Sequence, residues 1–184
     1  MDAAIAQARK MIADGADWLD IGGESSGPDS TEITQDEELQ RVIPLIKKIR
    51  EGSEIWISVD TWKSEVARKS LEAGADAVND VTALRGDTEM VKVIAEYKVP
   101  VILMFSKDKS ARTSRQDSDY VDVVGTLKSF FSERLKFADS NGIDKYESIK
   151  DKYFEYDSDI YKDIHNLKDK IHSLEHINKF KKDL

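Results

Sequence analysis

The chain has 184 residues, of which 40% are hydrophobic and 35% are charged, a balance typical of globular rather than disordered proteins. A formal net charge of −8 argues against nucleic-acid binding, because proteins that bind nucleic acid present a basic surface to the phosphates. The sequence contains no cysteine, and no apolar run approaches the roughly 20 residues that cross a membrane. We therefore expect a cytoplasmic protein that binds neither nucleic acid nor membranes.

Helices and short apolar strands alternate through the first 144 residues. In chain order, the pattern predicts a helix at Ala3–Ala13, a strand at Trp18–Ile21, a helix from Thr34 to about Arg50, a strand at Ile55–Val59, a helix at Trp62–Ala73, a strand at Ala77–Val81, a helix from Asp87 to about Tyr97, a strand at Pro100–Phe105 and a helix at Asp119–Asn141. Thr34 and Glu37 have the spacing of a capping box, and Asp87 is a suitable N-cap.

Short strands separated by helices of ten or more residues predict βαβ units and a parallel sheet. The strands are apolar on both faces, as expected where both faces are covered. Two architectures fit this pattern, a doubly wound sheet and a (β/α)8 barrel, and periodicity does not separate them. Both bind their ligands at the carboxyl ends of the strands.

The last 40 residues differ sharply from the rest. Residues 145–184 contain no Gly, Pro, Ala, Val, Thr or Arg, and they hold nine Lys and nine acidic residues. Apolar side chains recur there at spacings of three and four, which predicts one or two amphipathic helices with a nearly heptad seam. We therefore divide the chain into a βα domain at 1–143 and a helical extension at 144–184.

Polar side chains gather where the predicted strands end. The set comprises Asp20, Glu24, Ser25, Ser26, Asp60, Asn79 and Asp80. A carboxylate accepts two hydrogen bonds side by side, and an amide offers one donor and one acceptor. Asp60 and Asn79 together could read the amino-pyrimidinone edge of a pterin or a purine. The alternative is that such residues cap the helices that follow, as Thr61 would do for a helix starting at Trp62.

Six sequence blocks resemble those of dihydropteroate synthase, a family of pterin-binding (β/α)8 barrels. They are DIGGESSGP at 20–28, EELQRVIPLI at 37–46, ISVDTWKSEVARKSLEAGAD at 57–76, NDVTALRGD at 79–87, VPVILMFSKD at 99–108 and YVDVVGTLKSFFSERLKFADSNGI at 120–143. Together they cover roughly three-quarters of the chain in the family's order. The resemblance implies an α/β fold built from parallel βα units of a TIM-type barrel.

The resemblance also implies roles for four positions. Asp60 and Asn79 match the residues with which the family reads the pterin, and Asp20 matches a carboxylate that supports the pterin pocket. Ser26 matches a Thr beside p-aminobenzoate and the transferred pterin methylene. The implied reaction joins p-aminobenzoate to 6-hydroxymethyl-7,8-dihydropterin diphosphate and releases pyrophosphate, typically with Mg²⁺.

Several of the family's features have no counterpart in this sequence. The blocks correspond to the second to fifth strand units of the barrel, so the first strand, with its Asn for metal and diphosphate, is not matched. Nor are the later Asp-Pro-Gly motif, the Lys and the Arg-x-His pair, and Gly27 stands where the family usually has Arg. We therefore assign no catalytic residue and no metal ligand in this chain, and we expect an incomplete barrel from a truncated protein.

Two kinds of function follow from this pattern. The chain is either a dihydropteroate synthase-like enzyme of folate biosynthesis, weak or inactive alone, or a non-catalytic pterin-binding or interaction module from that family. An incomplete barrel has open strand edges, which favour pairing unless they are covered. Self-association, a complementing chain or the helical extension could each cover them.

Overall fold

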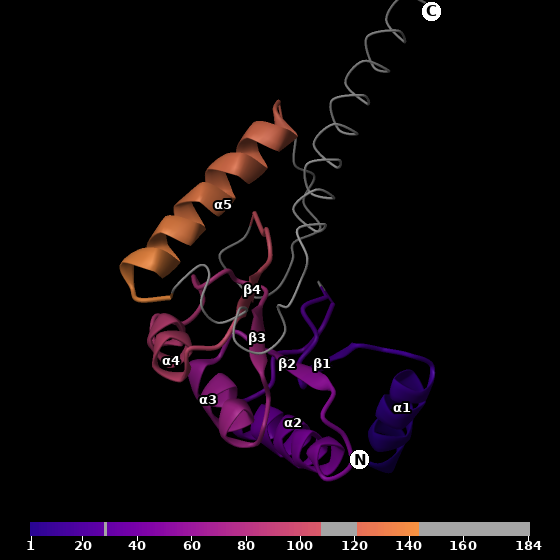
Figure 1. Ribbon diagram of the computed structural model, residues 1–184. Coiled ribbons are helices and arrows are strands. Elements are labelled where there is room, and N and C mark those ends of the chain that lie inside the picture. The colour runs from indigo at the N-terminus through magenta and orange to yellow at the C-terminus, as the bar shows by residue number, and fades with distance from the viewer. Residues whose placement is uncertain (28, 108–120, 144–184) are drawn as a thin grey trace, which may run out of the picture. The chain divides into compact units, whose positions relative to one another are not determined.

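A computed structural model describes residues 1–27, 29–107 and 121–143. Within these residues helices and strands alternate throughout (Figure 1). In chain order they are α1 (Asp2–Ala13), β1 (Trp18–Gly22), α2 (Gln35–Arg50), β2 (Trp56–Asp60), α3 (Ser64–Glu72), β3 (Ala77–Asp80), α4 (Met90–Tyr97), β4 (Val101–Leu103) and α5 (Val123–Ser140). All nine elements predicted in this region are present, with shifts at their ends. The predicted extension at 144–184 lies outside the described residues, and the domain division remains a prediction.

The four strands form one parallel sheet in the order β1-β2-β3-β4. Each strand pairs with the next one in sequence, and α2, α3 and α4 lie on the same side of the sheet (Figure 1). A doubly wound sheet reverses its strand order at a switch point and carries helices on both faces. Neither occurs in the described residues, so the βα units wind as in a (β/α)8 barrel. The described residues supply four strands, which make up part of such a barrel.

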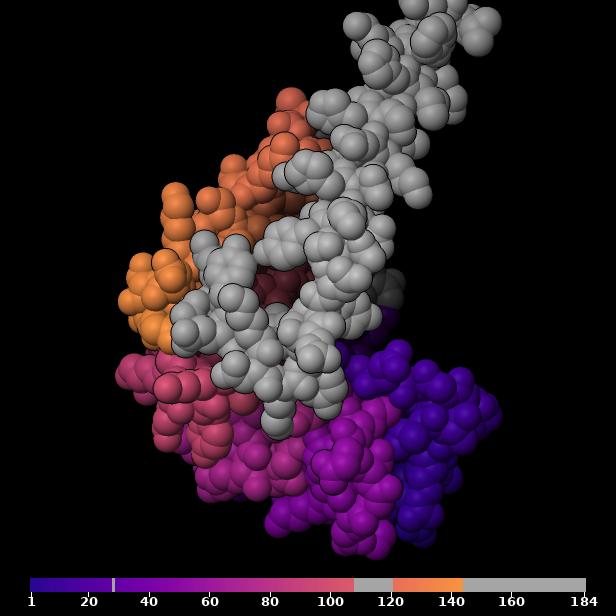
Figure 2. All heavy atoms as spheres, viewed as in Figure 1, coloured from indigo at the N-terminus to yellow at the C-terminus, as the bar shows by residue number. Residues whose placement is uncertain are grey.

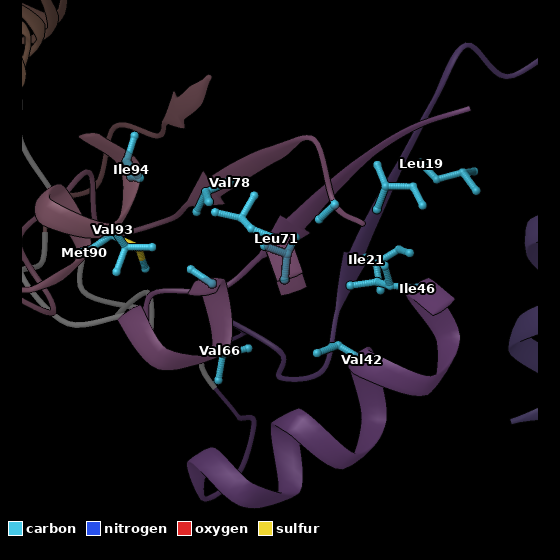
Figure 3. Close-up of a cluster of buried hydrophobic side chains, with 14 of the residues drawn as sticks. Leu19, Ile21, Val42, Ile46, Val66, Leu71, Val78, Met90, Val93 and Ile94 are labelled. Atoms are coloured by element: carbon cyan, nitrogen blue, oxygen red, sulfur yellow. The ribbon is translucent and has the colours of Figure 1, made fainter. Parts of the chain in front are cut away.

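Alternation along the strands gives the sheet two different faces. Leu19, Ile57, Val59 and Val78 point to the helix side and are at most 3% exposed. They interlock with side chains from the helices, as Figure 3 shows for a cluster labelled at Leu19, Ile21, Val42, Ile46, Val66, Leu71, Val78, Met90, Val93 and Ile94. The opposite face corresponds to a barrel interior, and it carries the polar residues described below.

The start of α2 agrees with the sequence. The Thr34 hydroxyl accepts a hydrogen bond from the Glu37 amide at 3.2 Å, and the Glu37 carboxylate accepts one from the Thr34 amide at 2.9 Å. The bond from the Thr34 amide, followed by one that the Thr34 hydroxyl donates to the same carboxylate at 3.1 Å, lowers the pKa of Glu37. The predicted capping box is therefore present.

The start of α3 differs from the prediction. The helix begins at Ser64 rather than Trp62, and Thr61 is not its cap. The Thr61 hydroxyl instead accepts from the Lys63 amide at 3.2 Å, while the Asp87 carboxylate accepts from the Ser64 amide at 2.8 Å. Asp87 also accepts from the Glu89 amide at 2.9 Å, just before α4. One carboxylate thus serves the starts of two neighbouring helices.

Arg50, the last residue of α2, binds the segments that directly precede β2 and β3, at the amino-terminal side of the sheet. Its guanidinium donates to the carbonyl of Gly74 at 2.8 Å, to the carbonyl of Ile55, and to the carboxylate of Asp76, with which it forms an ion pair. Gly74 has a φ of +111°, and a Cβ there would lie 2.9 Å from Arg50 Cγ. Gly74 is therefore required both by its backbone conformation and by the packing of Arg50.

Helix α1 packs against α2 next to the first strand. Ala8 is 7% exposed, and Ile12 packs on the core. Figure 2 shows the atoms of α1, in indigo, adjoining the purple and magenta surface that follows in the sequence. Across the part of the chain that the structure describes, no helix has both the length and the apolar character that crossing a membrane requires.

Candidate functional site

Asp20, Asp60 and Asn79 lie together at the carboxyl ends of three neighbouring strands. Gly22 of β1 is in register with Asp60, and Asp60 is in register with Asn79. The Asn79 side-chain amide donates to Asp20 Oδ2 at 2.9 Å. The structure therefore brings together all three residues that sequence reasoning assigned to a pterin, on the face of the sheet opposite the helices.

Asp20 is held by hydrogen bonds from two strands. Ser58 Oγ, from β2, donates to Asp20 Oδ1, and Trp18 Nε1 donates to Ser58 Oγ at 2.8 Å. With the Asn79 contact, these bonds form a continuous chain across β1, β2 and β3. Each carboxylate oxygen of Asp20 therefore has a fixed donor, which sets the orientation of the Asn79 amide.

Asp60 differs from Asp20 because its carboxylate has no hydrogen-bond donor among the described residues. The side chain is half-buried, and burial raises its pKa to about 6, with further contributions from the charges of Asp20, Glu38 and Asp80. A Cβ at Gly22 would lie 3.4 Å from Asp60 Oδ2, so the glycine leaves space beside the carboxylate. An unpaired, partly desolvated carboxylate is suited to a ligand that brings N–H donors.

Asp80, the last residue of β3, holds the loop that follows and does not belong to this site. It points to the opposite face of the sheet and is fully buried. Its carboxylate accepts from the Thr82 amide at 2.8 Å, the Thr82 hydroxyl at 2.7 Å and the Leu84 amide at 2.8 Å. Ala83 and Leu84 have φ values of 52° and 63°, a left-handed conformation that these bonds hold in place. Burial raises the pKa of Asp80 although the hydrogen bonds oppose it.

Ser26 lies in the loop between β1 and α2, and it borders a small pocket that Asp60 also lines. The pocket has room for about one water-sized sphere, about 10 Å³, and its lining residues are Glu24, Ser25, Ser26, Glu38, Asp60, Thr61, Trp62 and Val81. Ser26 and Asp60 therefore adjoin one another through this pocket. The two predicted ligand sides, for the pterin and for p-aminobenzoate, are adjacent.

Lys63 and Glu38 are two residues that sequence reasoning missed. Lys63 Nζ lies 2.6 Å from Glu38 Oε2 and 2.5 Å from Glu24 Oε2, and all three side chains are at most 10% exposed. A charged residue on an amphipathic helix is expected to face water. Glu38 instead lies one turn from the start of α2 on its buried side, and nothing in the helical pattern distinguishes it from the exposed Glu37 beside it.

Mg²⁺, which the family implies, is bound through carboxylate and other oxygen ligands. Among the described residues, no group of three or more His, Cys, Asp or Glu side chains could hold a metal ion. Asp20, a carboxylate on the rim, already accepts from Ser58 and Asn79. The described residues do not fit a magnesium site.

A family model described as "Pterin binding enzyme" matches residues 1–183. The chain belongs to the pterin-binding enzyme family. Among curated relatives, the dihydropteroate synthase of Synechocystis sp. is 40% identical over 140 residues, which are 76% of this chain and 48% of the relative. That of Bacillus subtilis is 38% identical over 151 residues, 82% of this chain and 50% of the relative. The chain thus spans about half the length of the curated relatives it matches.

Solved structures of the family give the same result. The dihydropteroate synthase of Xanthomonas albilineans with 4-aminobenzoic acid superimposes with a TM-score of 0.72 at 40% identity, covering 78% of this chain and 50% of that one. The enzyme from Vibrio fischeri gives a TM-score of 0.69 at 42% identity, covering 78% and 53%. The resemblance inferred from the six blocks, and its restriction to part of the family's length, are confirmed. The partial barrel predicted for the pterin-binding enzyme fold is confirmed as well.

Proposed function

We propose that this chain is a dihydropteroate synthase-like protein of folate biosynthesis that carries the pterin-reading part of the site. The observation that carries the proposal is the pairing of Asn79 with Asp20 beside the unpaired carboxylate of Asp60. A pterin presents an exocyclic amine and a ring N–H next to a carbonyl. Asp60 would accept from the two donors, and Asn79, fixed by Asp20, would meet the adjoining ring atoms.

The proposed reaction is the one that the family carries out. The amine of p-aminobenzoate attacks the exocyclic carbon of the pterin diphosphate, a C–N bond forms, and the C–O bond to the diphosphate breaks. The diphosphate leaves with the bonding electron pair, and the amine loses a proton to solvent. The role of Asp60, Asn79 and Asp20 is to hold the pterin in one orientation, and Ser26 would lie on the side of the entering amine.

The proposal assigns this chain part of the family's chemistry. In the family, Mg²⁺ acts on the departing diphosphate, but the described residues offer no ligand set for it, so no step here is routed through the metal. The proposed small-molecule ligands are the pterin diphosphate and p-aminobenzoate, and the proposed compartment is the cytoplasm. A second candidate, a pterin-binding module without catalysis, is favoured by the same observation, because Asp20, Asp60 and Asn79 come together while the described residues offer no ligand set for a metal.

Calorimetry with 6-hydroxymethylpterin at pH 7.5 tests the pterin assignment that both candidates share. The wild-type chain should bind, and Asp60→Ala should lose roughly 100-fold or more in affinity, since two hydrogen bonds to a charged acceptor contribute about 1.5–3 kcal/mol each. Asp17→Ala is the matched control, because Asp17 is an exposed carboxylate directly before β1, at the opposite end of the sheet. Equal affinity in wild type and Asp60→Ala would refute the proposal.

A further inference from the structure

The Lys63 ammonium group has an acceptor for each of its three protons, two from the loop between β1 and α2 and one from α2. It donates to Glu24 Oε2 at 2.5 Å, to the Ile33 carbonyl at 3.1 Å and to Glu38 Oε2 at 2.6 Å. Burial acts to lower the pKa of Lys63, but the hydrogen bonds to the two glutamates and their charges outweigh it and raise the pKa. The ammonium therefore stays charged at neutral pH.

These contacts join both ends of one loop to the strand that carries Asp60. Glu24 is near the start of the segment between β1 and α2, and Ile33 is near its end. Lys63 follows Asp60 by three residues and directly precedes α3. The loop is also closed from within, because the Ser30 hydroxyl lies 2.6 Å from the carbonyls of both Ser25 and Gly27.

The charges around Lys63 are not balanced within the cluster. Two glutamates share one ammonium, and the second oxygen of Glu38, Oε1, is buried without a hydrogen-bond partner. Glu24 and Glu38 line the same small pocket as Ser26 and Asp60. A buried ion cluster is weak support for stability, because the cost of removing its charges from water can exceed their mutual attraction. Such a cluster does fix geometry, because each charged group finds an oppositely charged partner at only one position.

We infer that Lys63 is a positioning residue for the second ligand, the aromatic amine. Through Glu24 and the Ile33 carbonyl it holds the 24–33 loop against the end of β2, which sets Ser26 relative to Asp60. Lys63 itself need not touch either ligand. The inference rests on the proposed function for the roles of Ser26 and Asp60, whereas the anchoring of the loop does not depend on any ligand.

Glu24→Ala is the variant that tests the anchor with the least damage. It removes the charged one of the two links from Lys63 to the loop and keeps the bond to the Ile33 carbonyl. Lys63 stays paired with Glu38, so no uncompensated ammonium remains buried. Glu24→Gln is the rescue, because its amide oxygen still accepts from Lys63. Glu72→Ala is the matched control, since Glu72 pairs with Lys69 at 2.8 Å on the surface, where the two side chains are 43% and 44% exposed.

Hydrogen exchange of the backbone amides at 24–33 gives the readout that is independent of ligand. Glu24→Ala should accelerate it about tenfold or more, as expected for the loss of a contact of at least about 1.4 kcal/mol. Glu24→Gln and Glu72→Ala should exchange like the wild type. Unchanged exchange in Glu24→Ala would overturn the inference whatever the protein binds.

The binding readout separates positioning from general destabilisation. In protein loaded with 6-hydroxymethylpterin, Glu24→Ala should bind p-aminobenzoate about tenfold more weakly. Its affinity for the pterin alone should stay within about twofold of wild type, and Glu24→Gln should restore the second affinity. Equal losses for both ligands would overturn the inference, because they indicate a general structural role. Failure of the wild type to bind pterin would instead count against the proposed function and leave the exchange result decisive for the anchor.

Discussion

The side-chain amide of Asn79 donates to the carboxylate of Asp20 across an intervening strand, at 2.9 Å, although the two residues are 59 positions apart. The strand between them is β2, which ends in Asp60. The bond therefore places a fixed negative charge beside a second carboxylate that has no donor among the described residues. This charge is the second largest cause, after burial, of the raised pKa of Asp60.

Replacing Asp20 should accordingly change the titration of Asp60. In Asp20→Asn the pKa of Asp60 should fall from about 6 toward its ordinary value of 3.8, although burial keeps it from reaching that value. Carbon-13 NMR titration of the side-chain carboxyl measures this directly. Asp17→Asn, at the far end of β1, should leave the titration of Asp60 unchanged. An Asp60 pKa that is the same in Asp20→Asn and in wild type would contradict the coupling.

Asp60 should lower the stability of the folded chain at neutral pH. Because its pKa is higher in the folded state than in the unfolded chain, the folded state binds the proton more tightly. The stability that Asp60 contributes is fully present below pH 3.8 and is lost as the pH rises through about 6. The ionised carboxylate at pH 7.5 therefore destabilises the fold.

Asp60→Asn should then be more stable than wild type at pH 7.5. The full pKa difference corresponds to about 3 kcal/mol, and partial exposure to solvent reduces the expected gain to about 1–2 kcal/mol. Urea unfolding at several pH values measures it, and the gain should shrink steadily as the pH is lowered from 7 to 4. A gain that does not depend on pH, or a less stable variant at pH 7.5, would show that the ionised Asp60 carries no such cost.

Asp60→Ala and Ser26→Ala should affect different ligands. Asp60→Ala removes the acceptor proposed for two pterin N–H groups, so it should weaken pterin binding far more than Ser26→Ala does. Ser26 lies in the loop on the side proposed for p-aminobenzoate, so its replacement should act mainly on that ligand. Calorimetry with each ligand in turn measures the split. Equal effects of the two substitutions on pterin affinity would remove the distinction between the two sides.

Most of the fold could be read from the sequence because its signals are local. The alternation of apolar strands with amphipathic helices predicted every element that the structure describes, and Thr34 with Glu37 predicted the start of α2. The start of α3 could not be predicted in this way. Its first amide is bound by Asp87, which is 23 residues further along the chain. A cap supplied from a distant segment depends on tertiary structure and leaves no mark in the adjoining sequence.

Strand ends together with the family resemblance predicted Asp20, Asp60 and Asn79, whereas the buried charges of the site were not predicted. Asn79 and Asp80 are adjacent in sequence, yet alternation sends them to opposite faces, so one joins the site and the other holds a loop. The family resemblance singled out Asn79, whereas the position at a strand end did not separate the two. Lys63 and Glu38 were not predicted as residues of the site, because a charged residue is normally expected on the surface.

The purified chain by itself should form little or no dihydropteroate from p-aminobenzoate and the pterin diphosphate. The residues on the described rim are suited to the pterin, but the family's Lys, its Arg-x-His pair and its Asn for metal and diphosphate have no counterpart in the sequence. Removing one preorganised electrostatic group already costs about 10²–10³ in rate, so the loss of several should reduce turnover below detection.

Pyrophosphate release measures the reaction, with the dihydropteroate synthase of Bacillus subtilis as the positive control. Turnover of roughly 1 s⁻¹ or more would contradict this expectation, because ordinary enzymes work at that rate with a complete site. Pterin binding without turnover would favour the non-catalytic module, for which the proposed site has only to hold the pterin.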